Sequence, residues 1–162
     1  MEPSKDLRAE VVLDDVDRMI VEELQRDGRM TNAELAERVG VAASTCVARV
    51  RGLVGRGIIT GFTATVDPAV MGRTLQVLVS VSIRSGARQR ISEFSDELRT
   101  LPEVLQLFFL GGVEDFIIHL AARDSDHVRD FVMEHLSAHP AVSSTRTSIL
   151  FSHYQNPVRL PE

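Results

Sequence analysis

The stretch of chain between residues 38 and 66 carries positive charge without any acidic residue to offset it. It holds four arginines, although the 162-residue chain has a net charge of −5 at pH 7. Guanidinium groups bind phosphate and the edges of guanine, so we expect an anionic partner to meet this stretch despite the acidic total. The candidate contact residues are these arginines and three small residues near them: Arg38, Ser44, Thr45, Ala48, Arg49, Arg51 and Arg56.

A second candidate site is the loop Gly111-Gly112-Val113-Glu114-Asp115. Two glycines expose backbone N–H groups and let a small ligand approach the chain closely. The carboxylate of Glu114 or of Asp115 could bind the ammonium group of an amino acid. The same residue types also form ordinary turns, so the loop by itself is equally well explained as a plain connection.

The remaining reactive side chains do not form a recognisable catalytic or metal centre. Glu114 and Asp115 are adjacent, so in a strand they would point to opposite faces. His135 and His139 could share a helix face, but a third metal ligand is not evident. Cys46 falls on the apolar side of a predicted helix and is expected in the core, with a redox-sensing thiol as the alternative. We therefore predict no catalytic residue, metal or cofactor.

Three helices are expected to position the arginine-rich stretch. Helical periodicity runs from Leu13 to Gly28. Thr31 and Glu34 form a capping box for a second helix, which ends at Gly40. A third helix begins near residues 43–44. This arrangement is a helix-turn-helix motif, whose second helix lies in the major groove of DNA.

The residues after the third helix differ in character. Residues 57–66 combine β-branched residues with glycines, which predicts a short β-hairpin or strand, the wing of a winged helix-turn-helix. Residues 67–74 contain Asp67-Pro68 and are expected to be a linker. Residues 1–12 mix charges without a period and are expected to be a flexible arm.

The second half of the chain alternates strands and helices. Strands are predicted at residues 75–83, 104–110, 116–122 and 142–152, with helices after the first and third of them. The order strand-helix-strand-strand-helix-strand is the ferredoxin-like unit. The expected fold class is α+β: an N-terminal winged helix-turn-helix plus a C-terminal ferredoxin-like βαββαβ domain with an antiparallel sheet.

Composition restricts the protein class. Apolar residues make up 44% of the chain and charged residues 25%, as in a soluble globular protein. No apolar run approaches the roughly 20 residues that span a bilayer, and we find no signal peptide. The single cysteine excludes an internal disulfide and fits a reducing compartment. A cytoplasmic protein without membrane contact is expected.

Several motifs in fixed order resemble the Lrp/AsnC, or feast/famine, regulators. The resemblance extends from about Leu13 to Ser152. The similar segments are Leu13-Asp14-Asp15-Val16-Asp17-Arg18-Met19-Ile20, Leu24-Gln25-Arg26-Asp27-Gly28-Arg29, Glu34-Leu35-Ala36-Glu37-Arg38-Val39-Gly40-Val41, Thr45-Cys46-Val47-Ala48-Arg49-Val50-Arg51-Gly52-Leu53, residues 57–64, the Gly112 to Phe116 loop and Val142-Ser143-Ser144-Thr145-Arg146-Thr147.

The resemblance implies a sequence-specific, DNA-binding transcriptional regulator that responds to an amino acid or a related metabolite. Its partners would be double-stranded DNA, that effector, and copies of itself, as a dimer and often an octamer of four dimers. The implied effector site comprises Gly111, Gly112, Val113, Glu114, Asp115, Phe116, Thr145 and Thr147. The implied parts are a DNA-binding domain at 13–66, the linker at 67–74, an effector-binding and oligomerisation domain at 75–152, and a tail at 153–162.

Two departures from the family pattern leave alternatives open. Gly52 and Val54 stand where similar proteins usually carry a basic and an acidic residue, and Gly55 adds a second glycine to the predicted recognition helix. Such a chain could have lost DNA binding and kept metabolite binding. An enzyme is the other alternative, because sirohaem decarboxylases resemble the same two-domain family, but the acid-free basic stretch favours DNA.

Overall fold

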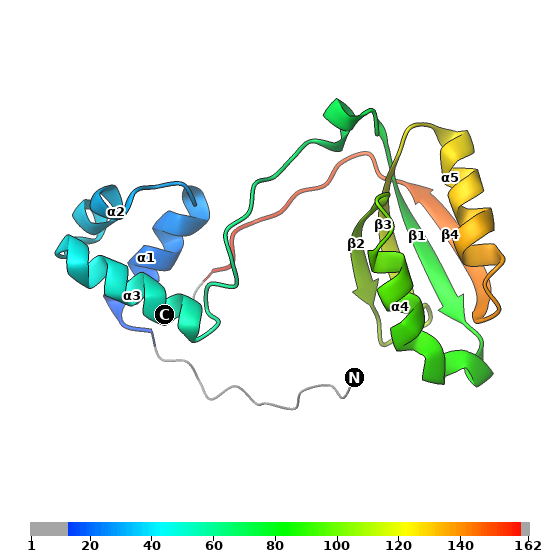
Figure 1. The fold of residues 1–162 in the computed structure, drawn as a ribbon, viewed down its shortest axis with the longest axis horizontal. Coiled ribbons are helices and arrows are strands. Elements are labelled where there is room, and N and C mark those ends of the chain that lie inside the picture. Colours follow the sequence, from blue (N-terminus) through cyan, green and yellow to red (C-terminus); the bar gives the residue numbers. More distant parts are fainter. Residues whose placement is uncertain (1–12, 160–162) are drawn as a thin grey trace. The chain divides into compact units, whose positions relative to one another are not determined.

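The computed structural model describes residues 13–159, apart from the side chain of Arg88. The expected arm at residues 1–12 and the last three residues of the expected tail lie outside the described residues. The chain forms two compact units (Figure 1). The first consists of residues 13–65 together with residues 155–159, and the second of residues 66–154. Within the described chain, every helix is too short or too polar to traverse a bilayer.

Three helices build the first unit. Helix α1 spans Asp15–Arg26, α2 spans Asn32–Val39, and α3 spans Ala43–Gly55. The helix-turn-helix prediction is therefore confirmed. The buried residues of these helices and their flanks form one core: Leu13, Ile20, Val21, Leu35, Ala36, Val39, Cys46 and Leu53.

The ends of these helices follow from local residue types. Asp14 caps α1, since its carboxylate accepts a hydrogen bond from the N–H of Asp17 at 2.8 Å. The predicted capping box of α2 is present: the N–H of Glu34 donates to Thr31 Oγ1, and the N–H of Thr31 donates to Glu34 Oε2. Gly40 ends α2 with a φ of 71°, a left-handed conformation that favours glycine.

The predicted wing is absent as regular structure, because residues 57–66 contain no strand. The N–H groups of Ile58 and Ile59 both donate to the carbonyl of Leu53, which folds this segment back against the end of α3. Both isoleucines pack against the helical core. These two apolar, β-branched residues therefore cover the core without pairing with another strand. Residue type alone does not distinguish this arrangement from a β-hairpin.

The second unit has the predicted ferredoxin-like order. Its elements are β1 (Leu75–Ile83), α4 (Ile91–Arg99), β2 (Val104–Phe109), β3 (Phe116–Ala122), α5 (Ser125–Phe131) and β4 (Val142–Ile149). The four antiparallel strands form one sheet in the spatial order β2-β3-β1-β4. Helix α5 continues into a π-helical segment, Val132–Ser137, which the sequence pattern did not predict.

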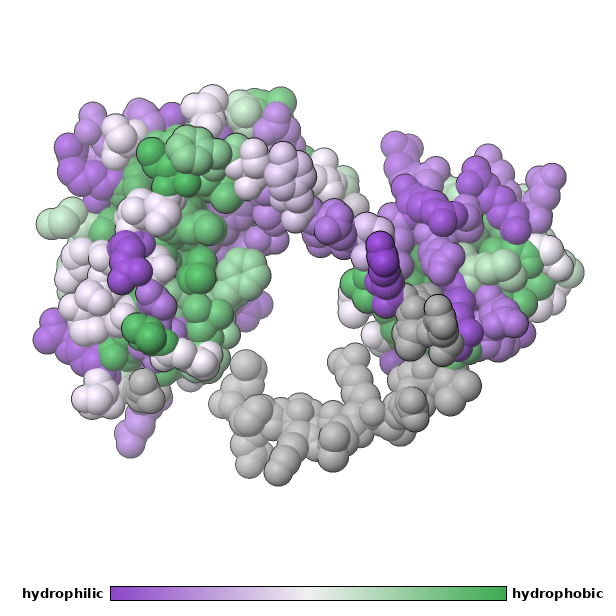
Figure 2. Space-filling model, turned by 180° about the vertical axis from the view of Figure 1, so that it is seen from behind, coloured by the Kyte–Doolittle hydropathy of each residue, from purple (hydrophilic) through white to green (hydrophobic). Residues whose placement is uncertain are grey.

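The sheet has one face covered by helices and one that is not (Figure 1). Val77, Val79 and Val81 of β1 are buried beneath α4 and α5, together with residues such as Phe94 and Phe131. Alternate residues of a strand point to opposite faces. The other face therefore carries the side chains between them, and Figure 2 shows hydrophobic residues gathered on it.

Candidate nucleic-acid interface and ligand pocket

The first turn of α3 presents small residues and backbone N–H groups to solvent. Ser44, Thr45 and Ala48 are all exposed. Ala42, which precedes the helix, provides no side-chain cap, and the first turn contains no acidic residue. The uncapped N–H groups and the positive end of the helix dipole favour an anion such as phosphate.

Arg51 projects from the middle of α3 and is exposed. Within residues 13–159 its side chain makes no hydrogen bond or ion pair, so its guanidinium group is available to a ligand. Arg38 differs, because it donates to Glu23 Oε2 at 2.8 Å. This hydrogen bond from Arg38, together with the charges of Arg26 and Arg38, lowers the pKa of Glu23.

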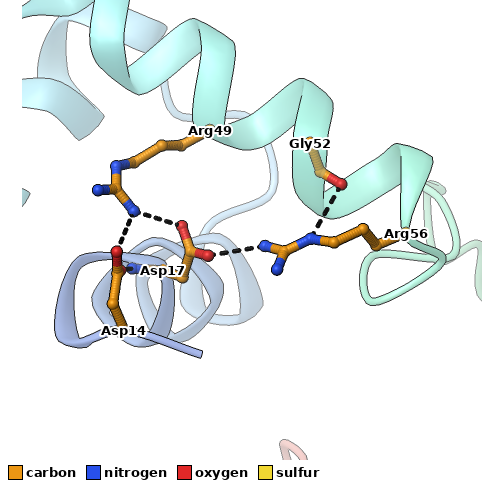
Figure 3. A network of polar contacts seen from close by, with 5 residues as sticks. All are labelled: Asp14, Asp17, Arg49, Gly52 and Arg56. Carbon is orange, nitrogen blue, oxygen red and sulfur yellow. Dashed lines mark hydrogen bonds and ion pairs between the residues drawn. The ribbon is translucent and has the colours of Figure 1, made fainter. Parts of the chain in front are cut away.

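The guanidinium groups of Arg49 and Arg56 point toward carboxylates at the start of α1 (Figure 3). Arg49 pairs with Asp14 and with Asp17 Oδ1, the latter at 2.9 Å, and Arg56 pairs with Asp17 Oδ2 at 2.7 Å. Hydrogen bonds to Asp14 and then Asp17 raise the pKa of Arg49. The pKa of Asp14 is lowered mainly by the hydrogen bond from the N–H of Asp17 and to a smaller extent by the hydrogen bond from Arg49. Of the four predicted arginines, only Arg51 thus has an uncommitted guanidinium.

Cys46 is fully buried in the helical core, as predicted. Burial raises the pKa of its thiol. A thiol that resists deprotonation is a poor nucleophile and a poor redox sensor. The structure therefore favours the packing role of Cys46 over the sensing role.

A pocket of about 470 Å³ adjoins the loop between β2 and β3. Two glycines and Asp115 form part of its lining, as the sequence led us to expect. Three apolar residues that the sequence reasoning missed complete it. The lining residues are Ile91, Phe109, Leu110, Gly111, Gly112 and Asp115.

The acidic residues of the loop have structural partners. Asp115 is buried, and its Oδ2 accepts a hydrogen bond from the N–H of Ile83 at 2.7 Å. Its own N–H donates to the carbonyl of Val81, which joins the loop to the end of β1. Glu114 accepts from Arg146 Nη1 at 3.2 Å. Asp115 is the one of the two carboxylates that lines the pocket.

The other predicted effector residues lie at different depths. Phe116 is fully buried, whereas Val113 is 89% exposed at the tip of the loop. Thr145 and Thr147 lie on β4 opposite Val81 and Val79 of β1, so both threonines share the helix-covered face at the sheet edge. None of these four residues lines the pocket.

The uncovered sheet face contains a buried histidine whose surroundings the sequence did not reveal. His119 Nε2 lies 2.9 Å from Gln76 Oε1 and Nδ1 lies 3.4 Å from Gln106 Oε1. The ring of His153 is 5.8 Å away. Burial lowers the pKa of His119, and the charge of His153 lowers it further. Both effects disfavour the charged form of the ring.

The histidines considered for a metal site have other contacts. The ring of His135 packs on Phe131, and the ring of His139 packs on Phe94. In the part of the chain that the structure describes, no three histidine, cysteine or acidic side chains gather closely enough to hold a metal ion.

The two units together define a class of protein: a helix-turn-helix DNA-binding protein with a ligand-binding domain on the same chain. A family model described as the AsnC-type helix-turn-helix domain matches residues 13–54, and one described as the Lrp/AsnC ligand binding domain matches residues 76–159. The chain belongs to the Lrp/AsnC family of transcriptional regulators, and the predicted family is confirmed. The predicted fold class is confirmed as a helix-turn-helix unit followed by a four-stranded antiparallel sheet with helices, although the wing is not present as strands.

Individual relatives support this assignment. The chain is 48% identical to the HTH-type transcriptional regulator AldR of Mycolicibacterium smegmatis, over 92% of this chain and 86% of the relative. It is 33% identical to the leucine-responsive regulatory protein of Escherichia coli, over 98% and 93%. A Neisseria meningitidis transcriptional regulator, solved as an L-Met complex, superposes with a TM-score of 0.81 at 32% identity, over 93% and 97%. These proteins are regulators and not enzymes, so the decarboxylase alternative is rejected.

Proposed function

We propose that this regulator reads a specific DNA sequence through α3 and responds to an amino acid with an apolar side chain. The observation that carries the DNA half of the proposal is the exposed, acid-free surface formed by the start of α3 and Arg51. The observation that carries the effector half is the pocket beside the β2–β3 loop.

Ser44, Thr45 and Ala48 would face the major groove in this arrangement. Hydroxyl groups at the helix start bond phosphates or base edges, and the methyl group of alanine contacts thymine. Arg51, with no competing carboxylate, is the strongest candidate for guanine or for a phosphate. A phosphate would have to displace a carboxylate from Arg38, Arg49 or Arg56, so these three are weaker candidates.

The pocket has the features of an amino-acid site. Ile91, Phe109 and Leu110 supply an apolar wall for a side chain, and Gly111 and Gly112 leave backbone N–H groups accessible to a carboxylate. The similar transcriptional regulator from Neisseria meningitidis was solved with L-Met, which supports a ligand of this kind. We also propose supporting roles around this site for the other predicted effector residues, which are Val113, Glu114, Phe116, Thr145 and Thr147.

A second copy of this chain is the proposed occupant of the uncovered sheet face. The half-buried Leu78 and Ile117 and the 46% exposed Phe108 lie there without helical cover. A large apolar face on a sheet favours association. Pairing would place two recognition helices on one DNA molecule and raise the effective concentration of the second. Octamers of four such dimers are the further proposed assembly.

Two experiments test the proposed function. Random duplex DNA would be enriched on the purified protein, and the selected duplex compared with a scrambled one at several salt concentrations. We expect selective binding, and Arg51→Ala should weaken it while Arg99→Ala, an exposed arginine of the other unit, should not. A thermal-shift screen of the twenty amino acids should single out apolar ones, because a ligand of the native state raises its melting temperature.

The dimer has its own test. Light scattering should report a dimer, or an assembly of dimers, for the wild type and a smaller species for Ile117→Lys. Met133→Lys, which adds the same charge at a 61% exposed site on the helical side, is the matched control. Equal masses for all three proteins would contradict the proposed interface.

A further inference from the structure

Asp17 is a buried charged residue of α1 whose carboxylate is shared by Arg49 of α3 and by Arg56, the residue that caps the end of α3 (Figure 3). Its Oδ1 lies 2.9 Å from Arg49 Nη1, and its Oδ2 lies 2.7 Å from Arg56 Nη2. Only 6% of Asp17 is exposed, so these ion pairs are shielded from water better than surface pairs. One side chain of α1 therefore holds α3 at two points.

The two held positions are seven residues apart, which places them on the same side of a helix. Gly52 and Gly55 lie between them, and each glycine costs about 1 kcal/mol of helix stability relative to alanine. No atom lies within 4 Å of a Cβ added at either position, so packing does not require glycine there. The ion pairs thus bridge the part of α3 that is weakest by residue type.

The pairing also determines which way Arg51 points. Arg51 follows Arg49 by two residues, a rotation of about 200° around the helix axis. When Arg49 faces α1, Arg51 must face away from it. The exposure of Arg51 and the pairing of Arg49 are therefore two results of one helix rotation.

We propose that Asp17 is a positioning residue for DNA recognition, which sets the rotation of α3 through Arg49 and Arg56. In this proposal Arg49 and Arg56 make contacts inside the protein, whereas Arg51 and the first turn of α3 contact the DNA. This inference rests on the proposed function, because it presupposes that α3 reads sequence.

A substitution of Asp17 tests this proposal, because a charge effect and a positioning effect would change DNA affinity in opposite directions. Asp17→Asn removes a negative charge and releases two arginines, so electrostatics alone predicts tighter binding of every duplex. Positioning predicts the reverse for the selected duplex: its affinity should fall by about tenfold or more, the size of a lost base contact, while the scrambled duplex binds as well as before or better. The matched control is Asp15→Asn, an exposed residue of the same helix whose one ion pair within residues 13–159 is with Arg18.

A ratio of selected to scrambled affinity that is the same in Asp17→Asn and Asp15→Asn would overturn the inference. A wild-type protein that selects no sequence would instead refute the proposed function itself. The two failures are therefore distinguishable. Binding is measured below the melting temperature of each variant, so that folded proteins are compared.

A second variant keeps the inference testable if Asp17→Asn does not fold. Arg56→Gln changes a side chain that is 45% exposed and removes one of the two links. A positioning role predicts a lower affinity ratio with an unchanged salt slope. A phosphate contact predicts equal losses for both duplexes and a salt slope smaller by about 1, and that result would overturn the assignment of Arg56.

Discussion

The carboxylate of Asp115 accepts a hydrogen bond from the backbone N–H of Ile83, and this bond is buried. Asp115→Ala would leave that N–H without its acceptor, at a cost of about 1–3 kcal/mol in the free energy of unfolding. Asp115→Asn keeps an oxygen at the same place and should cost less. Urea denaturation of both variants measures the difference, and equal stability of the alanine variant and the wild type would contradict it.

Gln25 holds the end of the described chain on the helix-turn-helix unit. Its Nε2 donates to the carbonyl of Val158 at 3.0 Å, and its Oε1 accepts from the N–H of Val158 at 2.7 Å. We expect Gln25→Ala to lower the free energy of unfolding by about 1 kcal/mol and to speed amide exchange at Val158. Mass spectrometry after hydrogen exchange measures this, with the exposed Gln89→Ala as control. Unchanged exchange at residues 155–159 would show that the tail is held by other contacts.

His119 makes stability depend on pH. Burial lowers the pKa of its ring below the ordinary value of about 6.5. As the pH falls through that value, the unfolded chain takes up a proton before the folded one does, so the free energy of unfolding decreases. His119→Gln should reduce this acid sensitivity, whereas His135→Gln, a ring packed on Phe131, is the comparison. Denaturation at about pH 7.5 and pH 5.5 decides: a wild type no more acid-sensitive than His119→Gln would refute the prediction.

Cys46 should be unreactive in the native protein. It has no exposed surface, and burial raises the pKa of its thiol. Labelling with a disulfide reagent should be slow in buffer and complete in denaturant, with a rate that follows the unfolded fraction. Rapid labelling of the folded protein would point to the sensing role instead.

Much of the fold could be predicted from local pattern. The alternation along Leu75–Ile83 predicted β1, and the Thr31–Glu34 capping box placed the start of α2. These signals depend on residues close in sequence. The failed wing at residues 57–66 shows their limit, because β-branched residues suit a strand and also suit a bend such as that of Ile58 and Ile59, which pack on the helical core.

The partners of the arginines could not be found by counting charge. Arg49 and Asp17 are 32 residues apart, and helical periodicity along residues 13–28 does not indicate a partner for Asp17. A signal was nevertheless present. Arg49 lies three residues after Cys46 and four before Leu53, on the buried side of α3, and an arginine on that side needs a carboxylate.

The pocket proposed as the ligand site was half predictable for a similar reason. Gly111, Gly112 and Asp115 belong to one loop, so the turn pattern identified them. Ile91 precedes them by 20 residues and reaches the pocket only because α4 packs against β2, which is a tertiary contact. The hydrogen bond from Ile83 to Asp115 likewise joins residues that only the folded sheet brings together.

The two outer strands of the sheet differ in chemistry, with a consequence for the behaviour of the protein at high concentration. Strand β4 ends the sheet with hydroxyl groups, Arg146 and one exposed apolar residue, Ile149, whereas β2 ends it with Leu105, Phe108 and Phe109, all exposed. Outer strands offer unpaired backbone groups to other molecules, and apolar ones without charge are the most prone to aggregate. Aggregation of partly unfolded protein should therefore start at β2, where a lysine would act as a gatekeeper.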